Sequence, residues 1–149
     1  HGLVLACNEG AVMTVGFGHR YPSVEVWSTS RVDQPWRVDD EGIDAVSDLL
    51  HAAHVAVSDD VPANEEWHYR PMGTGVTVPW RIILKLRIST LAGFEGGTKI
   101  YANTISPAAL AAMLLPKLFQ ARAAGRIAPM DLGDECEIPR GALAATWAR

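Results

Sequence analysis

The fold follows from residues 80–89, which read WRIILKLRIS. Apolar and polar positions alternate along this stretch. The apolar positions are Trp80, Ile82, Leu84, Leu86 and Ile88. The positions between them are Arg81, Ile83, Lys85, Arg87 and Ser89. Because successive side chains of a strand point to opposite faces of a sheet, the stretch predicts a strand with one buried face and one face that carries three cations.

Elements on both sides of this strand complete a pattern of strands and helices. Short apolar or alternating runs predict further strands at residues 4–6, 12–17, 24–27, 65–71 and 99–103. A helix follows Asp39-Asp40, either of which can cap it, because apolar residues then recur at spacings of three and four. This stripe consists of Ile43, Val46, Leu49, Leu50, Ala53 and Val57. A second helix begins at Ser106-Pro107 and ends at Gly125.

This order predicts an α+β fold with a largely antiparallel sheet and helices packed on one face. We expect residues 1–126 to form one domain and residues 127–149, which mix proline, glycine and acidic residues, to form a C-terminal tail. The other face of the sheet is then free for an anionic ligand. The charged and polar residues expected there are Glu66, His68, Arg70, Arg81, Lys85 and Arg87.

Composition excludes several classes of protein. The 149 residues carry a net charge of −4 without a block of like charges, so we expect no nucleic-acid partner. The longest apolar stretch, residues 108–116, is far shorter than the ~20 residues that span a bilayer, so we expect no membrane partner. The two cysteines, Cys7 and Cys136, are too few and too far apart for a disulfide framework, which favours a reducing, cytoplasmic location.

A motif near the middle of the chain resembles a known family. Residues 93–103, GFEGGTKIYAN, are followed by Ser106-Pro107 and resemble the GFE-x-GTG-x-YIN-P stretch of galactose-1-phosphate uridylyltransferase-like proteins, in the histidine-triad (HIT-like) superfamily. Residues 66–71, EWHYRP, are similar to that family's histidine-aromatic strand, and residues 21–27 to its YP-x-EVW strand. The resemblance covers roughly residues 3–124.

The resemblance implies a HIT-like fold and nucleotidyl transfer between a nucleotide sugar and a sugar phosphate through a nucleotidyl-histidine. The family's nucleophile stands in a His-Pro-His motif of its N-terminal half, and this chain contains no His-x-His. The chain therefore resembles the C-terminal, substrate-binding half, completed by an N-terminal catalytic half or by a homodimer, and its catalytic residues are unknown. A first residue that is His1 rather than methionine agrees with a piece of a longer protein.

The resemblance also implies particular site residues. Phe94 and Glu95 match the pair that touches the hexose, and His68 matches a histidine of the metal-bearing strand. From the strand pattern, Lys85 and Arg87 are candidates to receive phosphate. Two departures from the family motif argue against assigning metal ligands, so no metal ligand is named and the cofactor stays unknown, with a divalent metal as the less favoured alternative. Lys99 replaces a glycine of the motif, and Glu66 stands where some members have histidine.

Three alternatives stay open at this level. The chain is a substrate-binding half of a transferase, a noncatalytic HIT-like ligand-binding or dimerisation module, or an enzyme with a different reaction that uses His68 as acid or base. Each site residue also has a purely structural interpretation: strand cations protect a sheet from aggregation, and a single histidine on a sheet often satisfies only local hydrogen bonds. His51 and His54 are expected to be a surface pair.

Overall fold

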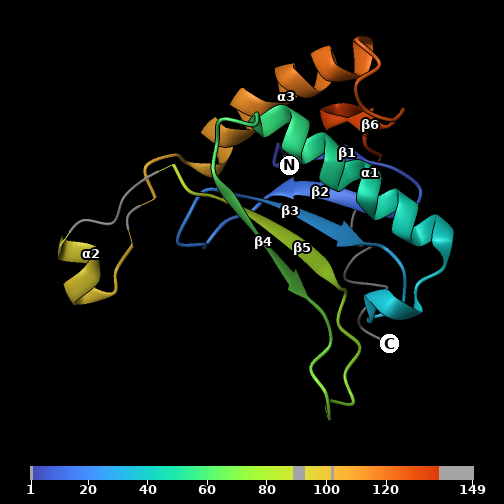
Figure 1. Cartoon of the computed structure of the whole chain (residues 1–149), viewed down its shortest axis with the longest axis horizontal. Coiled ribbons are helices and arrows are strands. Elements are labelled where there is room, and N and C mark those ends of the chain that lie inside the picture. The colour runs from blue at the N-terminus through green and yellow to red at the C-terminus, as the bar shows by residue number, and fades with distance from the viewer. Residues whose placement is uncertain (1, 89–92, 102, 138–149) are drawn as a thin grey trace.

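A computed structural model describes residues 2–88, 93–101 and 103–137 of the chain. One sheet has the strand order β4-β5-β3-β2-β1-β6, and all of its paired neighbours are antiparallel. The strands are β1 (Val4–Cys7), β2 (Ala11–Val15), β3 (Ser23–Ser28), β4 (Ala63–His68), β5 (Arg81–Leu86) and β6 (Asp131–Leu132). The helices are α1 (Asp40–Val57), α2 (Gly93–Thr98) and α3 (Pro107–Ala123). The predicted α+β architecture is confirmed (Figure 1).

The strand predicted at residues 80–89 is β5, an interior strand that begins at Arg81 and ends at Leu86, and residue 89 lies outside the described residues. It pairs with β3 on one side and with β4 on the other, so Ile82 lies between Val26 and Trp67. Ile82, Leu84 and Leu86 are buried in the main core. Burying each such side chain stabilises the fold by about 1.5–3 kcal/mol, which is why this alternation dictates a strand here.

Both long helices begin where their capping residues predicted. The Asp39 carboxylate accepts a hydrogen bond from the Gly42 N–H at 3.0 Å, and the Ser106 hydroxyl accepts one from the Ala109 N–H at 3.2 Å. The apolar stripe of α1 is buried along Val46, Leu49, Ala53 and Val57, and Ala52 and Ala56 are buried with it. Past the end of α3, Gly125 has a φ of 64°, a conformation that favours glycine.

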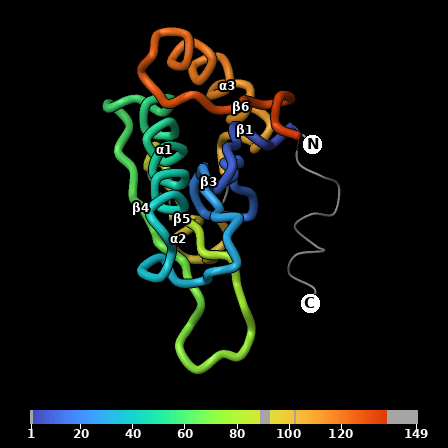
Figure 2. The backbone as a smooth tube through the Cα atoms, turned by 90° about the vertical axis from the view of Figure 1, so that its right-hand side faces the viewer, coloured from blue at the N-terminus to red at the C-terminus, as the bar shows by residue number. Residues whose placement is uncertain are grey.

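The helices α1 and α3 cover one face of the sheet, as Figures 1 and 2 show from two directions. The core lies between them and the strands, and Met13, Val24, Leu49 and Leu118 are among its fully buried members. The opposite face of the sheet carries no described helix, and it is called the open face below. Among the described residues, no helix is long and apolar enough to cross a bilayer.

Several predicted strands have other bounds in the structure, and one strand was not predicted. The strand predicted at residues 65–71 is β4, which begins and ends earlier, at Ala63 and His68. The strand predicted at residues 99–103 is wrong for residues 99–101, which follow the short helix α2, and residue 102 lies outside the described residues. The additional strand is β6, whose Leu132 is fully buried against β1. Residues 93–98, which include three glycines, form the short helix α2.

Residues 127–137 pack closely on the rest of the molecule. Ile127, Met130 and Leu132 belong to the core, and β6 extends the sheet beyond β1. Arg122 of α3 holds this segment by donating to the Met130 carbonyl at 2.8 Å and to the Glu135 carboxylate at 2.6 and 3.0 Å. The remainder of the predicted tail, residues 138–149, lies outside the described residues.

Candidate functional site

The strand register determines which side chains share the open face. Residues paired across an antiparallel ladder point to the same side of the sheet. One row of paired residues is therefore Val12, Trp27, Arg81 and His68. The next row is Thr14, Glu25, Ile83 and Glu66, and a third contains Ser23, Lys85 and Asn64. Charged side chains from three adjacent strands meet on this surface.

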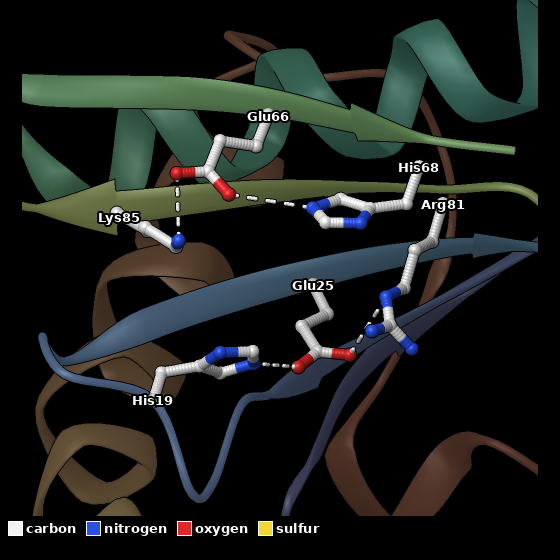
Figure 3. A network of polar contacts seen from close by, with 6 residues as sticks. All are labelled: His19, Glu25, Glu66, His68, Arg81 and Lys85. Atoms are coloured by element: carbon white, nitrogen blue, oxygen red, sulfur yellow. Dashed lines mark hydrogen bonds and ion pairs between the residues drawn. The ribbon is translucent and has the colours of Figure 1, made fainter.

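Glu25 lies at the centre of the open face and is only 6% exposed. Its carboxylate is hydrogen-bonded to His19 Nε2 on one oxygen and lies 3.9 Å from Arg81 Nε on the other (Figure 3). A buried carboxylate requires such partners because its desolvation is costly. Gly16 makes the arrangement sterically feasible, since a Cβ at this position would lie 2.9 Å from Glu25 Oε1.

A second carboxylate, Glu66, lies on β4 beside the first cluster. Lys85 Nζ lies 2.6 Å from Glu66 Oε1, and His68 Nε2 lies 3.3 Å from Glu66 Oε2 (Figure 3). The hydrogen bond from Lys85 is the main cause that holds the pKa of Glu66 below its usual value, and the hydrogen bond with His68 lowers it further. Glu66 is therefore ionised at neutral pH, and Lys85 faces a permanent negative charge.

An aromatic platform adjoins these ion pairs. The Arg81 guanidinium lies over the Trp27 ring, with its central carbon 4.3 Å from the ring centroid. Such a contact orients the guanidinium and leaves donors available at its edge. The side chains of Arg81 and Lys85 are 29% and 22% exposed, so both are held in place but accessible from solvent.

The structure brings some predicted site residues together and separates others. His68 and Lys85 meet at Glu66. Arg87 lies beyond the end of β5, where its side chain is exposed and its backbone N–H donates to the Pro62 carbonyl at 2.7 Å. Arg70, expected on the open face, instead pairs with Asp33 at 2.8 Å because β4 ends before it.

Phe94 and Glu95 lie on α2, which stands apart from the sheet at the left of Figure 1. The Phe94 side chain is 64% exposed. The segment after α2 returns to the sheet, since Tyr101 lies under the Arg20 guanidinium at 4.3 Å and Arg20 follows His19. Contact of Phe94 and Glu95 with a hexose therefore remains a prediction, and α2 is tethered to the loop that bears His19.

Sequence reasoning did not identify His19. This residue lies outside the strands, in the turn between β2 and β3, and its partner Glu25 is six positions away on β3. Glycines at positions 16 and 18 flank it closely, and this was the local signal of a turn that passes over the sheet. Periodicity describes side chains within strands, so it gives no information about a loop histidine.

The described residues do not fit a divalent metal at this site. On β4, Glu66 and His68 lie together, but the ammonium of Lys85 already pairs with the Glu66 carboxylate. Within residues 2–88, 93–101 and 103–137, no group of three or more His, Cys, Asp or Glu side chains could hold a metal ion.

Three solved structures have a fold similar to that of the chain. The chain is similar to a uridylyltransferase (TM-score 0.67, 17% identity over 80% of this chain and 42% of that one). It is similar to an ADP-glucose phosphorylase from Arabidopsis thaliana with bound ADP-glucose (TM-score 0.69, 21% identity, 76% and 39%). It is also similar to a GALT-like protein from Arabidopsis thaliana (TM-score 0.66, 20% identity, 76% and 41%).

The chain thus has the HIT-like fold of the uridylyltransferases and spans about two fifths of the length of these structures, as a half-length domain does. No curated protein matches the chain. One protein family matches residues 1–145. The chain belongs to the family described as "Domain of unknown function (DUF4921)".

Proposed function

We propose that the chain is the substrate-binding half of a nucleotidyltransferase resembling galactose-1-phosphate uridylyltransferase, and that its open face binds a nucleotide sugar or a sugar phosphate. The observation that carries this proposal is the cluster of Glu25, Glu66, Arg81 and Lys85, held side by side next to Trp27 on the sheet face that no described helix covers. The fold shared with uridylyltransferases supports it.

The mixture of charges fits this class of ligand. A sugar phosphate presents anionic oxygens at one end and hydroxyl donors at the other. Arg81, Lys85 and His68 can donate hydrogen bonds to the phosphate, and the carboxylates can accept hydrogen bonds from hydroxyls. The Trp27–Arg81 pair offers a flat surface to a ring. A polynucleotide would instead need a continuous cationic stripe, and the carboxylates interrupt it here.

The nucleophile of such a reaction has to come from elsewhere. The chain contains no His-x-His, so a histidine from an N-terminal catalytic half or from a second copy of the chain would attack the phosphorus. In this arrangement the open face neutralises and orients the phosphate, which lowers the barrier by fixing the reacting groups in place.

Calorimetry on the chain tests the proposal. We expect binding of galactose-1-phosphate, UDP-glucose or ADP-glucose, with a roughly tenfold weaker Kd in Lys85→Ala and in Arg81→Ala, because each substitution removes a charge-assisted hydrogen bond worth about 1.5–3 kcal/mol. Lys117→Ala is the matched control, since Lys117 is an exposed cation of α3, on the other side of the sheet. Equal affinities in all three variants would overturn the assignment of the open face.

The main alternative is a noncatalytic ligand-binding or dimerisation module on the same half-fold. The lack of a His-x-His motif agrees with such a module as well as with a substrate-binding half. Incubating the chain with a radiolabelled nucleotide sugar and a hexose phosphate, with and without a catalytic half, separates the two. Transfer that requires the added half supports the substrate-binding half. Binding without transfer in either mixture supports the module, and a labelled adduct on this chain would contradict both.

A further inference from the structure

The two cysteines lie at the same edge of the sheet although 128 residues separate them in the sequence (positions 8 to 135). Cys7 is the last residue of β1, and its Cα is paired with that of Asp131 in β6. The chain then turns through Gly133–Glu135, and Cys136 Sγ donates to the carbonyl of the same Asp131 at 3.3 Å. Asp131 therefore adjoins both cysteines.

The two thiols also interact directly. Burial is the main cause that raises the pKa of Cys136, and its hydrogen bond with the Cys7 thiol raises it further. Each cysteine is intermediate in exposure, and both are reduced in this structure. Two cysteines that adjoin the same residue at one edge of a sheet and share a hydrogen bond are placed for a disulfide, which forms once their Cβ atoms come within the range that the bond spans.

Both cysteines line surface pockets. Cys7 lines a surface pocket of about 700 Å³ together with Arg122, Met130 and Asp131. Cys136 lines a second pocket of about 450 Å³ with Phe119 and Leu132. These volumes are large enough to admit a small organic disulfide.

We propose that Cys7 and Cys136 form a reversible disulfide that fastens the β6 segment to β1 when the surrounding thiol pool becomes oxidised. The oxidant is a low-molecular-weight disulfide such as glutathione disulfide. One cysteine thiolate attacks it, forms a mixed disulfide and releases one glutathione. The second cysteine then attacks the protein sulfur of that mixed disulfide and releases the other. In total, the two thiols lose two protons and two electrons, and one disulfide is reduced to two thiols.

The consequence is a covalent lock on a segment that non-covalent contacts otherwise hold. The Arg122–Glu135 ion pair and the burial of Leu132 attach β6 to the domain, and both can open locally. A disulfide between positions 7 and 136 would close nearly the whole chain into a loop. Closing a long loop reduces the freedom of the unfolded chain and so raises the melting temperature.

The test compares the 149-residue chain equilibrated in oxidised and in reduced glutathione. After oxidation, we expect intact-mass spectrometry to show the loss of two hydrogen atoms, no thiol available to alkylation, a monomer on a non-reducing gel and a Tm raised by about 5–15 °C. Dithiothreitol should reverse all four changes. Because the pKa of Cys136 is raised, exchange is slow at neutral pH and is followed to equilibrium.

The single variants Cys7→Ser and Cys136→Ser are the controls. Each should take up one glutathione at its remaining cysteine, and neither should show the rise in Tm. Two glutathiones on the wild-type chain, a disulfide-linked dimer, or two free thiols at equilibrium would each overturn the proposal. The reduced wild-type protein provides the folding reference, so a variant that folds poorly does not affect these outcomes.

Discussion

The two faces of the sheet bury their central residues by different means. On β3, Val24 and Val26 face the helices, and Ser23 and Glu25 face the other way, yet all four are nearly inaccessible to solvent. The valines face α1 and stabilise the fold through removal of apolar surface. Glu25 is covered by His19 and Arg81 and depends on their hydrogen bonds and charges.

The open face therefore carries the desolvation cost of a buried carboxylate, which the helix-covered face does not. A buried carboxylate with its partners is seldom more stabilising than well-packed apolar residues of the same volume. An apolar residue on the open face would therefore stabilise the fold as well as Glu25 does. Stability alone does not account for the charged cluster, and this supports the ligand proposed for that face.

The largest expected effect comes from a substitution that removes packed apolar groups on the helix-covered face. Leu84 of β5 is 1% exposed and belongs to the core. Leu84→Ala should lower the free energy of unfolding by about 2–5 kcal/mol, because it removes buried methyl groups and leaves a cavity. Urea denaturation measures this loss. Ligand affinity per folded molecule should stay unchanged, and a loss of stability below about 1 kcal/mol would contradict the assigned core.

An intermediate effect is expected from removing the carboxylate at the centre of the open face. Glu25→Ala leaves His19 and Arg81 without their partner, and a lost hydrogen bond at a buried site costs about 1–3 kcal/mol. Urea denaturation of Glu25→Ala, His19→Ala and the double variant gives the coupling energy between the two residues. We expect the double variant to lose less than the sum of the single variants. Strict additivity would mean that the Glu25–His19 contact does not form.

Strand and helix positions could be predicted because their causes are local. The alternation along residues 80–89 and the capping residues Asp39 and Ser106 are visible within one element. The same reasoning placed Arg81, Lys85, Glu66 and His68 on one face. It wrongly extended β4 to Pro71, because the strand ends at His68 and Arg70 pairs with Asp33, a contact that nothing in the alternation marks.

Features that depend on distant parts of the chain could not be predicted. The two-residue strand β6 is too short to have a period, and its pairing with β1 joins opposite ends of the chain. The same pairing brings Cys7 to Cys136, which sequence separation had suggested to be unrelated thiols. His19 reaches Glu25 from a turn. In each case the determining contact is between elements, and a pattern within one element carries no information about it.

The smallest expected effect distinguishes the faces by their response to pH. The helix-covered side of β5 has no titratable side chain, and on the open face Lys85 and His68 hold the pKa of Glu66 below its usual value of 4.5. A carboxylate with a lowered pKa in the folded state contributes stability above the unfolded pKa and loses it as the pH falls through the folded one. The free energy of unfolding of wild type should exceed that of Glu66→Gln at neutral pH, and this difference should shrink as the pH falls below about 4.5.

The magnitude is below about 1 kcal/mol, because the Glu66 side chain is 42% exposed and solvent screens the pair. Thermal unfolding of both proteins between pH 7 and pH 3 measures the difference. Leu84→Ala provides the control, since its stability curve should run parallel to that of wild type across the same range. A Glu66→Gln curve that is also parallel to wild type would mean that Lys85 does not stabilise the charged form of Glu66. It would contradict one of the two carboxylate clusters assigned to the open face.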